Sequence, residues 1–141
     1  MEEEDITFTF EQSLLKAGQA GNNNVVTTLL ELGANIDYQN EEGGTALIFA
    51  SQNRHYQVVE LLLKENADIN LQDQEGWTAL MFASKNGHYQ VVQLLLKVNT
   101  DPSLQTLECL TALIFASGNG HDQVVELLLK ENANPNIQTQ E

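Results

Sequence analysis

Apolar positions along this chain follow a pattern that returns every 33 residues. The segment TALIFAS begins at Thr45, TALMFAS begins at Thr78, and TALIFAS returns at Thr111. Each segment carries apolar residues at helical spacing, and the threonine hydroxyl before them can accept a hydrogen bond from a free backbone N–H at the start of a helix. We therefore expect a short helix after each of these threonines.

A second apolar segment follows each of the first after a short polar turn. It reads HYQVVELLLK over residues 55–64, HYQVVQLLLK over 88–97 and HDQVVELLLK over 121–130. The valines and leucines form the apolar stripe of a second helix. Glycine and asparagine tolerate the left-handed conformation that ends a helix. We expect the second helices to end at Gly33, Asn66, Asn99 and Asn132.

The same pattern reaches the start of the chain, because stepping back 33 residues from Thr45 leads to Gln12 without a gap. Four units follow from this, at about 7–40, 41–73, 74–106 and 107–139. An acidic tail at 1–6 precedes them, and residues 140–141 begin a further turn. A helix pair of this size cannot cover its own apolar face, whereas stacked pairs can. The predicted fold is an all-α repeat solenoid.

The sequence resembles the ankyrin-repeat family over nearly its whole length. The resemblance rests on the 33-residue period, the Asn86-Gly87-His88 turn with its copy at 119–121, the V-V-x-L-L-L helix and the A-x-x-N tail. It implies helix-turn-helix pairs joined by β-hairpin finger turns. The chain departs from the family motif where alanine replaces proline and Ile or Met replaces histidine: Ala46, Ala79, Ala112, Ile48, Met81 and Ile114. Arg54 takes a turn-glycine position, at a cost of about 1 kcal/mol if that position needs a positive φ.

The composition and charge of the chain limit the classes of partner and the cellular location that we expect. The chain has 141 residues, enough for one domain with a real core, and a formal charge of −14 from 20 acidic and 6 basic residues. Such a surface repels nucleic acid and anionic lipid and favours partners with basic faces. The equal alternative is that the charge serves solubility alone. A single cysteine excludes an internal disulfide. The N-terminus is acidic and no apolar run reaches membrane-spanning length, so we expect a cytoplasmic protein, with the nucleus as the open alternative.

Catalytic and metal chemistry is not indicated. His55, His88 and His121 recur once per unit, so they lie about a helix-packing distance of 10 Å apart and cannot share a zinc ion. We expect each imidazole to bond backbone in the turn between helices. Cys109 has no evident catalytic partner. The sequence predicts a non-enzymatic protein without a metal or cofactor.

The resemblance implies that a protein or peptide binds the finger tips and the exposed side of the first helices, on the concave face. Carried over position by position, the partner-binding residues are Glu41, Glu42, Gln74, Glu75, Trp77, Lys85, Asn86, Leu107, Glu108, Leu110 and Asn119. Trp77, Leu107 and Leu110 would form an apolar strip with an acidic rim, suited to a partner of basic and apolar character. The alternative is that Trp77 folds down and packs on the neighbouring finger.

Further expectations concern two single segments, one at Asn70 and one at residues 106–110. Asn70 resembles the asparagine that oxygen-sensing hydroxylases modify in this family, and its plainer role is to stabilise the turn between units, as for Asn136. TLECL, residues 106–110, is expected to be the finger turn of the fourth unit, with Cys109 where Gly43 and Gly76 stand. It is either a modified finger that adds apolar contact or a decayed one.

The two ends of the array differ. The first unit resembles a capping repeat, whereas the last unit has no polar substitutions on its outer faces. This favours a fragment of a longer array, or a C-terminal face that is covered by a partner or by a second copy. We expect a monomer, or weak end-to-end self-association through the uncapped C-terminal unit. Besides partner binding, two other functions stay open: a structural spacer within a larger protein, and a regulatory segment that docks on another domain.

Overall fold

The computed structural model describes residues 3–98 and 102–131, with side chains described for 8–98 and 110–130. Eight helices make up this part of the chain, in four consecutive pairs. They are α1 (Glu3–Ala20), α2 (Asn23–Glu31), α3 (Ala46–Gln52), α4 (Tyr56–Lys64), α5 (Ala79–Lys85), α6 (Tyr89–Val98), α7 (Pro102–Gly118) and α8 (Asp122–Glu131).

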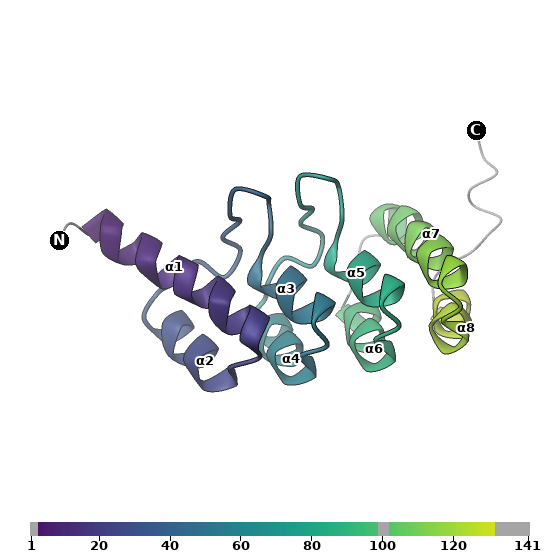
Figure 1. Cartoon of the computed structure of the whole chain (residues 1–141), viewed down its shortest axis with the longest axis horizontal. Coiled ribbons are helices and arrows are strands. Elements are labelled where there is room, and N and C mark those ends of the chain that lie inside the picture. Colours follow the sequence, from purple (N-terminus) through teal and green to yellow (C-terminus); the bar gives the residue numbers. More distant parts are fainter. Residues whose placement is uncertain (1–2, 99–101, 132–141) are drawn as a thin grey trace.

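The pairs stack side by side into two rows of helices (Figure 1). The first helices α1, α3, α5 and α7 contact one another in order, and so do the second helices α2, α4, α6 and α8. The apolar stripes meet between the rows, where Leu14, Leu62, Leu80, Leu95 and Leu128 are fully buried. The predicted all-α repeat solenoid is confirmed.

Local signals in the sequence fix where the short helices begin. Thr45 and Thr78 are the N-caps of α3 and α5, and their hydroxyls accept from the N–H groups of Ile48 (3.1 Å) and Met81 (3.3 Å). Each hydroxyl satisfies one of the backbone donors that a helix start leaves without an intrahelical partner. The predicted caps at these two threonines are confirmed.

Positive φ angles occur where the repeat needs them. Arg54 has φ 66° and Asn66 has φ 68°, so both adopt the left-handed conformation. The glycines at the position of Arg54 do the same; these are Gly21, Gly87 and Gly120. The Arg54 position does need a positive φ, which was the condition for the predicted loss of about 1 kcal/mol in stability there. Asn99, Asn132 and Asn136 lie outside the described residues.

Two fingers project from the helices, between α2 and α3 and between α4 and α5 (Figure 1). In the first, Asn40 Oδ1 accepts from the N–H groups of Glu42 (3.0 Å) and Gly44 (2.9 Å). In the second, Asp73 Oδ1 accepts from Glu75 and Trp77, each at 2.9 Å. Gly43 and Gly76, with φ of 85° and 86°, complete the two turns. One side-chain acceptor and one left-handed glycine thus make each finger.

The expected finger in the fourth unit is absent, because residues 102–118 form one continuous helix, α7. The two residues that make the other fingers are both replaced there: Thr106 stands where Asn40 and Asp73 stand, and Cys109 stands where the glycines stand. Without that acceptor and that glycine, helix is the better conformation for a segment that begins with proline, the residue favoured at a first helical position. Thr111 is consequently inside a helix and not an N-cap.

The first unit also lacks a finger. Helix α1 begins at Glu3, so residues 3–6 of the predicted acidic tail are helical. Helices α1 and α7 therefore lie on either side of the two fingers (Figure 1).

Candidate functional site

The face formed by the two fingers and the first helices α1, α3, α5 and α7, which we call the concave face, carries most of the predicted site. The fingers are held to each other by backbone and side-chain bonds. Gln74 N donates to Glu42 O at 2.9 Å, and the Gln74 side chain donates to Glu41 O. A Cβ on Gly43 would lie 2.7 Å from Asp73 Cα, so the backbones approach too closely for any side chain there. Gln74 thus joins the two fingers, and its predicted contact with a partner stays a prediction.

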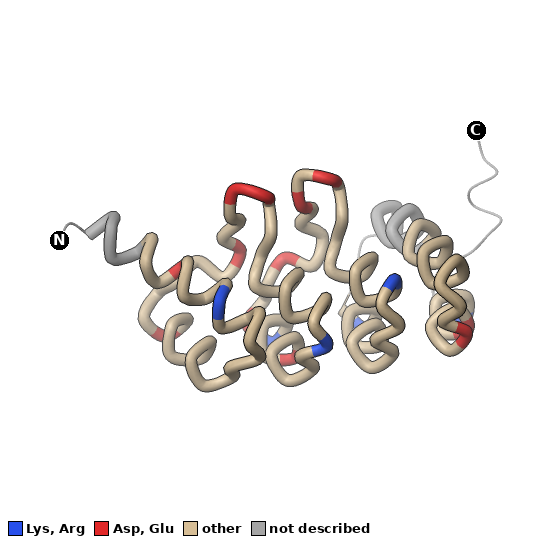
Figure 2. The backbone as a smooth tube through the Cα atoms, viewed as in Figure 1, with Lys and Arg blue, Asp and Glu red and all other residues tan. Residues whose placement is uncertain are grey.

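Acidic residues gather along the backbone of the finger tips, as the red segments of Figure 2 show. Glu41, Glu42 and Glu75 are all exposed. With a formal charge of −14 on the whole chain, a tip built in this way attracts cationic groups. The tips therefore form one acidic rim of the concave face.

Trp77 lies between the second finger and the first helices, half-buried. Its ring stacks on Phe115 of α7, with centroids 4.3 Å apart and planes at 24°, and it contacts Phe82 of α5 at 4.8 Å. The Lys85 ammonium lies 5.2 Å from the centre of the indole. Trp77 thus packs down, as in the alternative interpretation, but onto helices α5 and α7 and not onto the neighbouring finger.

Other predicted partner-binding residues lie around this aromatic cluster with differing roles. Lys85, Asn86 and Asn119 are exposed at the ends of α5 and α7. The Asn86 side chain donates to Gln52 O (3.3 Å), and that of Asn119 donates to Phe115 O (2.9 Å). Leu110 is half-buried on α7. Leu107 and Glu108 are helical, and their side chains lie outside the described ones, so the predicted strip of Trp77, Leu107 and Leu110 stays a prediction.

The histidines link successive units. The Nε2 atoms of His55, His88 and His121 lie 2.7, 2.9 and 2.8 Å from the carbonyl oxygens of Gln19, Gln52 and Lys85. The predicted bond to backbone is confirmed, but its acceptor belongs to the first helix of the preceding unit. Burial lowers the pKa of His88 below 6.5, Arg54 lowers it further, and the bond to Gln52 opposes them. These imidazoles are structural ties.

Metal ligation finds no support. Among the described side chains, those of residues 8–98 and 110–130, no three of His, Cys, Asp or Glu cluster in a way that could hold an ion. Among the helices of residues 3–98 and 102–131, none combines the length and the apolar character needed to span a bilayer.

Asn70 is half-buried. Its N–H donates to Asp68 Oδ1 at 2.9 Å, which turns the chain between units. Its own Oδ1 is buried without a partner among the described residues. Modification of Asn70 stays a prediction.

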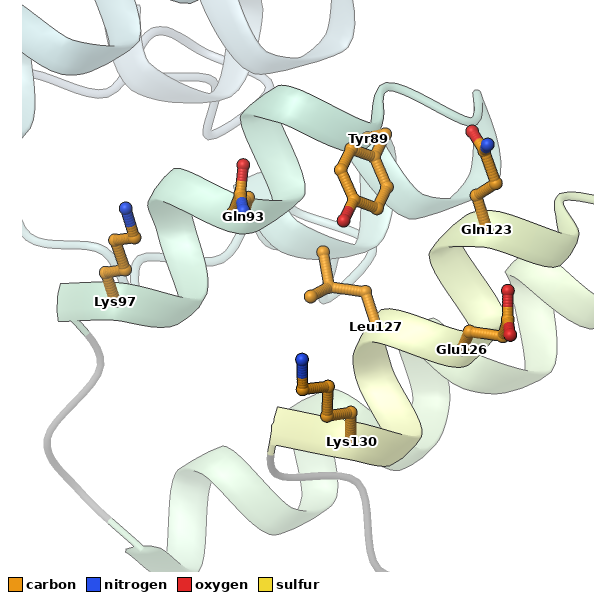
Figure 3. A pocket seen from close by; sticks show the side chains of 7 residues that line it. All are labelled: Tyr89, Gln93, Lys97, Gln123, Glu126, Leu127 and Lys130. Atoms are coloured by element: carbon orange, nitrogen blue, oxygen red, sulfur yellow. The ribbon is translucent and has the colours of Figure 1, made fainter.

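Two hollows mark the surface of the described residues. One, of about 510 Å³, lies on the concave face between α1 and the first finger. The other, of about 440 Å³, lies between α6 and α8 on the row of second helices (Figure 3). In that second hollow Lys97 and Lys130 lie near one end, with Tyr89 and Leu127 toward the middle, and the lining holds neither a nucleophile paired with a base nor a set of metal ligands.

A family model described as ankyrin repeats, in three copies, matches residues 14–106 and again, in an overlapping match, residues 67–139. The chain belongs to the ankyrin-repeat family. No curated protein matches it. Ankyrin repeats are generally protein–protein interaction modules and typically not enzymes. The geometry agrees with that role, because the concave face offers an aromatic cluster, an acidic rim and a groove.

Proposed function

We propose that this ankyrin-repeat chain binds a segment of a partner protein across its concave face, without catalysing a reaction. The observation that carries the proposal is the arrangement around Trp77: a half-buried aromatic cluster beside exposed carboxylates at the finger tips. An apolar centre with a polar rim is the common organisation of protein interfaces. The rim favours a partner with basic residues beside apolar ones.

The proposal includes a cytoplasmic location, which the presence of only one cysteine supports. The spacer and regulatory-docking functions remain the alternatives. A spacer would only set the distance between neighbouring domains and would bind nothing on its concave face. The spacer function and the proposed binding function therefore differ in whether changes at the finger tips affect the binding of a partner.

Charge reversal at the finger tips tests the proposal. A variant with Glu41→Lys, Glu42→Lys and Glu75→Lys changes only exposed side chains. Proteins captured from cell extract by the wild-type chain are identified, and the affinity of each purified partner is measured. We expect the partner to bind the tip variant at least tenfold more weakly, since reversing three rim charges replaces attraction with repulsion.

The matched control reverses three exposed glutamates on the second helices, with Glu31→Lys, Glu60→Lys and Glu126→Lys. It has the same net charge as the tip variant, so it separates the location of the charge from its amount. A partner that loses affinity equally for both variants, or for neither, contradicts binding at the concave face.

The outer face of the fourth unit supports a second candidate, weak end-to-end self-association. Ile114 is 61% exposed, whereas Ile48, its counterpart two units earlier, is 3% exposed. Leu129 is 46% exposed, and its counterpart Leu96 is 5% exposed. In the inner units these positions are covered by the next helix pair, so this face is suited to another such pair.

Light scattering across a concentration series tests self-association. We expect the weight-average mass of the wild-type chain to rise with concentration and that of Ile114→Glu to stay monomeric. Leu32→Glu, an equally apolar and 57% exposed position in the first unit, is the control and should associate as the wild type does. A wild-type chain that stays monomeric at every concentration rules this candidate out.

A further inference from the structure

The groove between α1 and the first finger presents aromatic rings, a cation and two carboxylates to solvent. Its volume is about 510 Å³, and its lining includes Phe8, Lys16, Tyr38, Glu41, Glu42 and Phe49. Phe8 is 48% exposed and meets Tyr38 edge-on, with centroids 6.3 Å apart, at one side of the groove. The question is what kind of side chain this lining accepts.

The repeat itself contains a filled version of this site. Around Trp77, the indole stacks on Phe115, contacts Phe82 and lies under the ammonium of Lys85. Two periods of 33 residues earlier, Phe115 corresponds to Phe49 and Phe82 corresponds to Lys16. The groove therefore keeps the stacking phenylalanine and exchanges the second ring for a cation.

The residue that would fill the groove is missing from this copy. The counterpart of Trp77 is Glu11, whose carboxylate turns away and accepts from Asn35 N at 3.1 Å. Among the described residues, no aromatic ring stacks on Phe49. The Phe49 ring does have a support, because a Cβ on Gly44 would lie only 2.6 Å from its Cζ atom. Phe49 is thus held against the finger backbone as a stacking surface without a partner ring.

We propose that this groove is a subsite for one aromatic side chain of the partner segment, with basic residues on either side of that ring. The inference rests on the proposed function and adds the chemistry of the partner. The partner's ring would stack on Phe49 as Trp77 stacks on Phe115. The Lys16 ammonium would lie next to that ring, and aromatic faces attract a nearby cation.

The lining distinguishes an aromatic ring from an arginine. A guanidinium can also stack on Phe49, but it would bring its charge beside the Lys16 ammonium. The carboxylates of Glu41 and Glu42 lie on the finger side of the groove. They favour basic residues next to the ring in the partner's sequence and disfavour acidic ones.

Peptide titrations followed by NMR of the ¹⁵N-labelled chain test the subsite. The probes are acetylated and amidated Lys-Lys-Trp-Lys-Lys, the same peptide with alanine at the centre, and the same peptide with arginine at the centre. The quantity measured is the ratio of the alanine-peptide Kd to the tryptophan-peptide Kd, which cancels the attraction of the flanking lysines. We expect a ratio of roughly five or more, the fold-change of one aromatic pair, and an arginine peptide weaker than the tryptophan peptide.

Two variants locate the effect. Phe49→Leu removes the ring but keeps an apolar side chain, and Lys16→Met removes the cation from an exposed position. Both should lower the ratio, and Phe49→Leu should bring it near one. Tyr89→Leu, which removes a 37% exposed ring from α6, should leave the ratio unchanged. If Phe49→Leu does not fold, Lys16→Met and the peptide-induced shifts at the groove amides decide the result.

Three outcomes overturn the inference: a wild-type ratio of one, an arginine peptide that binds as tightly as the tryptophan peptide, or an unchanged ratio in both groove variants. None of these bears on the finger-tip charge reversal. If the natural partner binds the tip variant as tightly as the wild type, the proposed function is contradicted, and the peptide results do not change that conclusion.

Discussion

Replacing Trp77 with alanine should weaken the junction between the third and fourth units and leave the rest of the stack unchanged. The indole joins three neighbours: Phe82 in its own unit, Phe115 in the next unit, and Lys85. Each aromatic pair contributes about 0.5–1.5 kcal/mol beyond its buried area, and the cation–π contact contributes about 0.5–1 kcal/mol. The substitution should therefore cost about 1.5–4 kcal/mol.

The position of the contact decides where that cost appears. In a solenoid, stability is close to a sum of unit terms and nearest-neighbour interface terms. The stack of Trp77 on Phe115 belongs to the interface of α5 with α7, and the fourth unit has no described neighbour on its other side. Weakening this interface should let α7 and α8 open before the other helices.

Amide hydrogen exchange measures this opening helix by helix. Opening α7 and α8 breaks the Trp77–Phe115 pair but keeps the contacts of Trp77 with Phe82 and Lys85, so about 0.5–1.5 kcal/mol of the cost acts on this opening. This corresponds to exchange roughly twofold to tenfold faster, because about 1.4 kcal/mol is a factor of ten. We expect that acceleration at Val124 and Leu128 in α8 and little change at Val58 and Leu62 in α4. Trp77→Phe, which keeps a ring at the site, should show a much smaller effect. Equal acceleration in α4 and α8, or unchanged protection in α8, would refute the reasoning.

Two further predictions concern the tie between the second and third units. Arg54→Gly should raise the free energy of unfolding by about 1 kcal/mol, because Arg54 has φ 66° where three other units have glycine; a lower urea midpoint would contradict this. Since burial and Arg54 lower the pKa of His88 below 6.5, the unfolded chain takes up a proton there more readily. The stability that the neutral imidazole provides is present above that pH and is lost as the pH falls below it. His88→Gln should therefore flatten the fall of the urea midpoint between pH 7.5 and 5.5, and an unchanged pH profile would exclude His88 as the cause.

Much of the fold could be predicted because residues with the same structural role recur at the same positions in successive units. The caps at Thr45 and Thr78 and the left-handed position at Arg54 are local, so a residue type at a fixed place is enough to indicate them. The imidazole bonds were predicted as backbone contacts, but their acceptors lie 36 residues earlier. That part depends on how units stack, which the sequence of one unit does not contain.

The fourth finger was predicted wrongly because its register was inferred from spacing alone. The signal that decides it was in the sequence: a finger needs both the side-chain acceptor of Asn40 or Asp73 and a left-handed glycine. Thr106 offers only a hydroxyl, which forms such turns more weakly than Asn or Asp, and Cys109 lacks the freedom of glycine at positive φ. The segment becomes part of α7. Conserving the length of a repeat therefore does not conserve its finger.

The aromatic cluster was missed for a different reason. Phe82 and Phe115 occupy equivalent positions in successive first helices, where an apolar residue is expected whether or not it contacts a finger. Their contact with Trp77 depends on the path of the second finger, which brings residue 77 toward the first helices. The sequence indicated that Trp77 lies at a finger, but it could not show which rings its indole would contact.

The two ends of the concave face differ through very few side chains. Helices α1 and α7 flank the fingers (Figure 1). Phe49 lines the groove beside α1, and Phe115 of α7 meets Trp77 of the second finger. At the α7 end, Trp77 stacks on Phe115, so that face of the Phe115 ring is occupied within the chain. At the α1 end, the Glu11 carboxylate accepts from Asn35 N, and the Phe49 ring lines the groove that we propose as the aromatic subsite. In a framework that repeats almost verbatim, the exchanges of Trp77 for Glu11 and of Phe82 for Lys16 thus separate an internal aromatic contact from the proposed subsite.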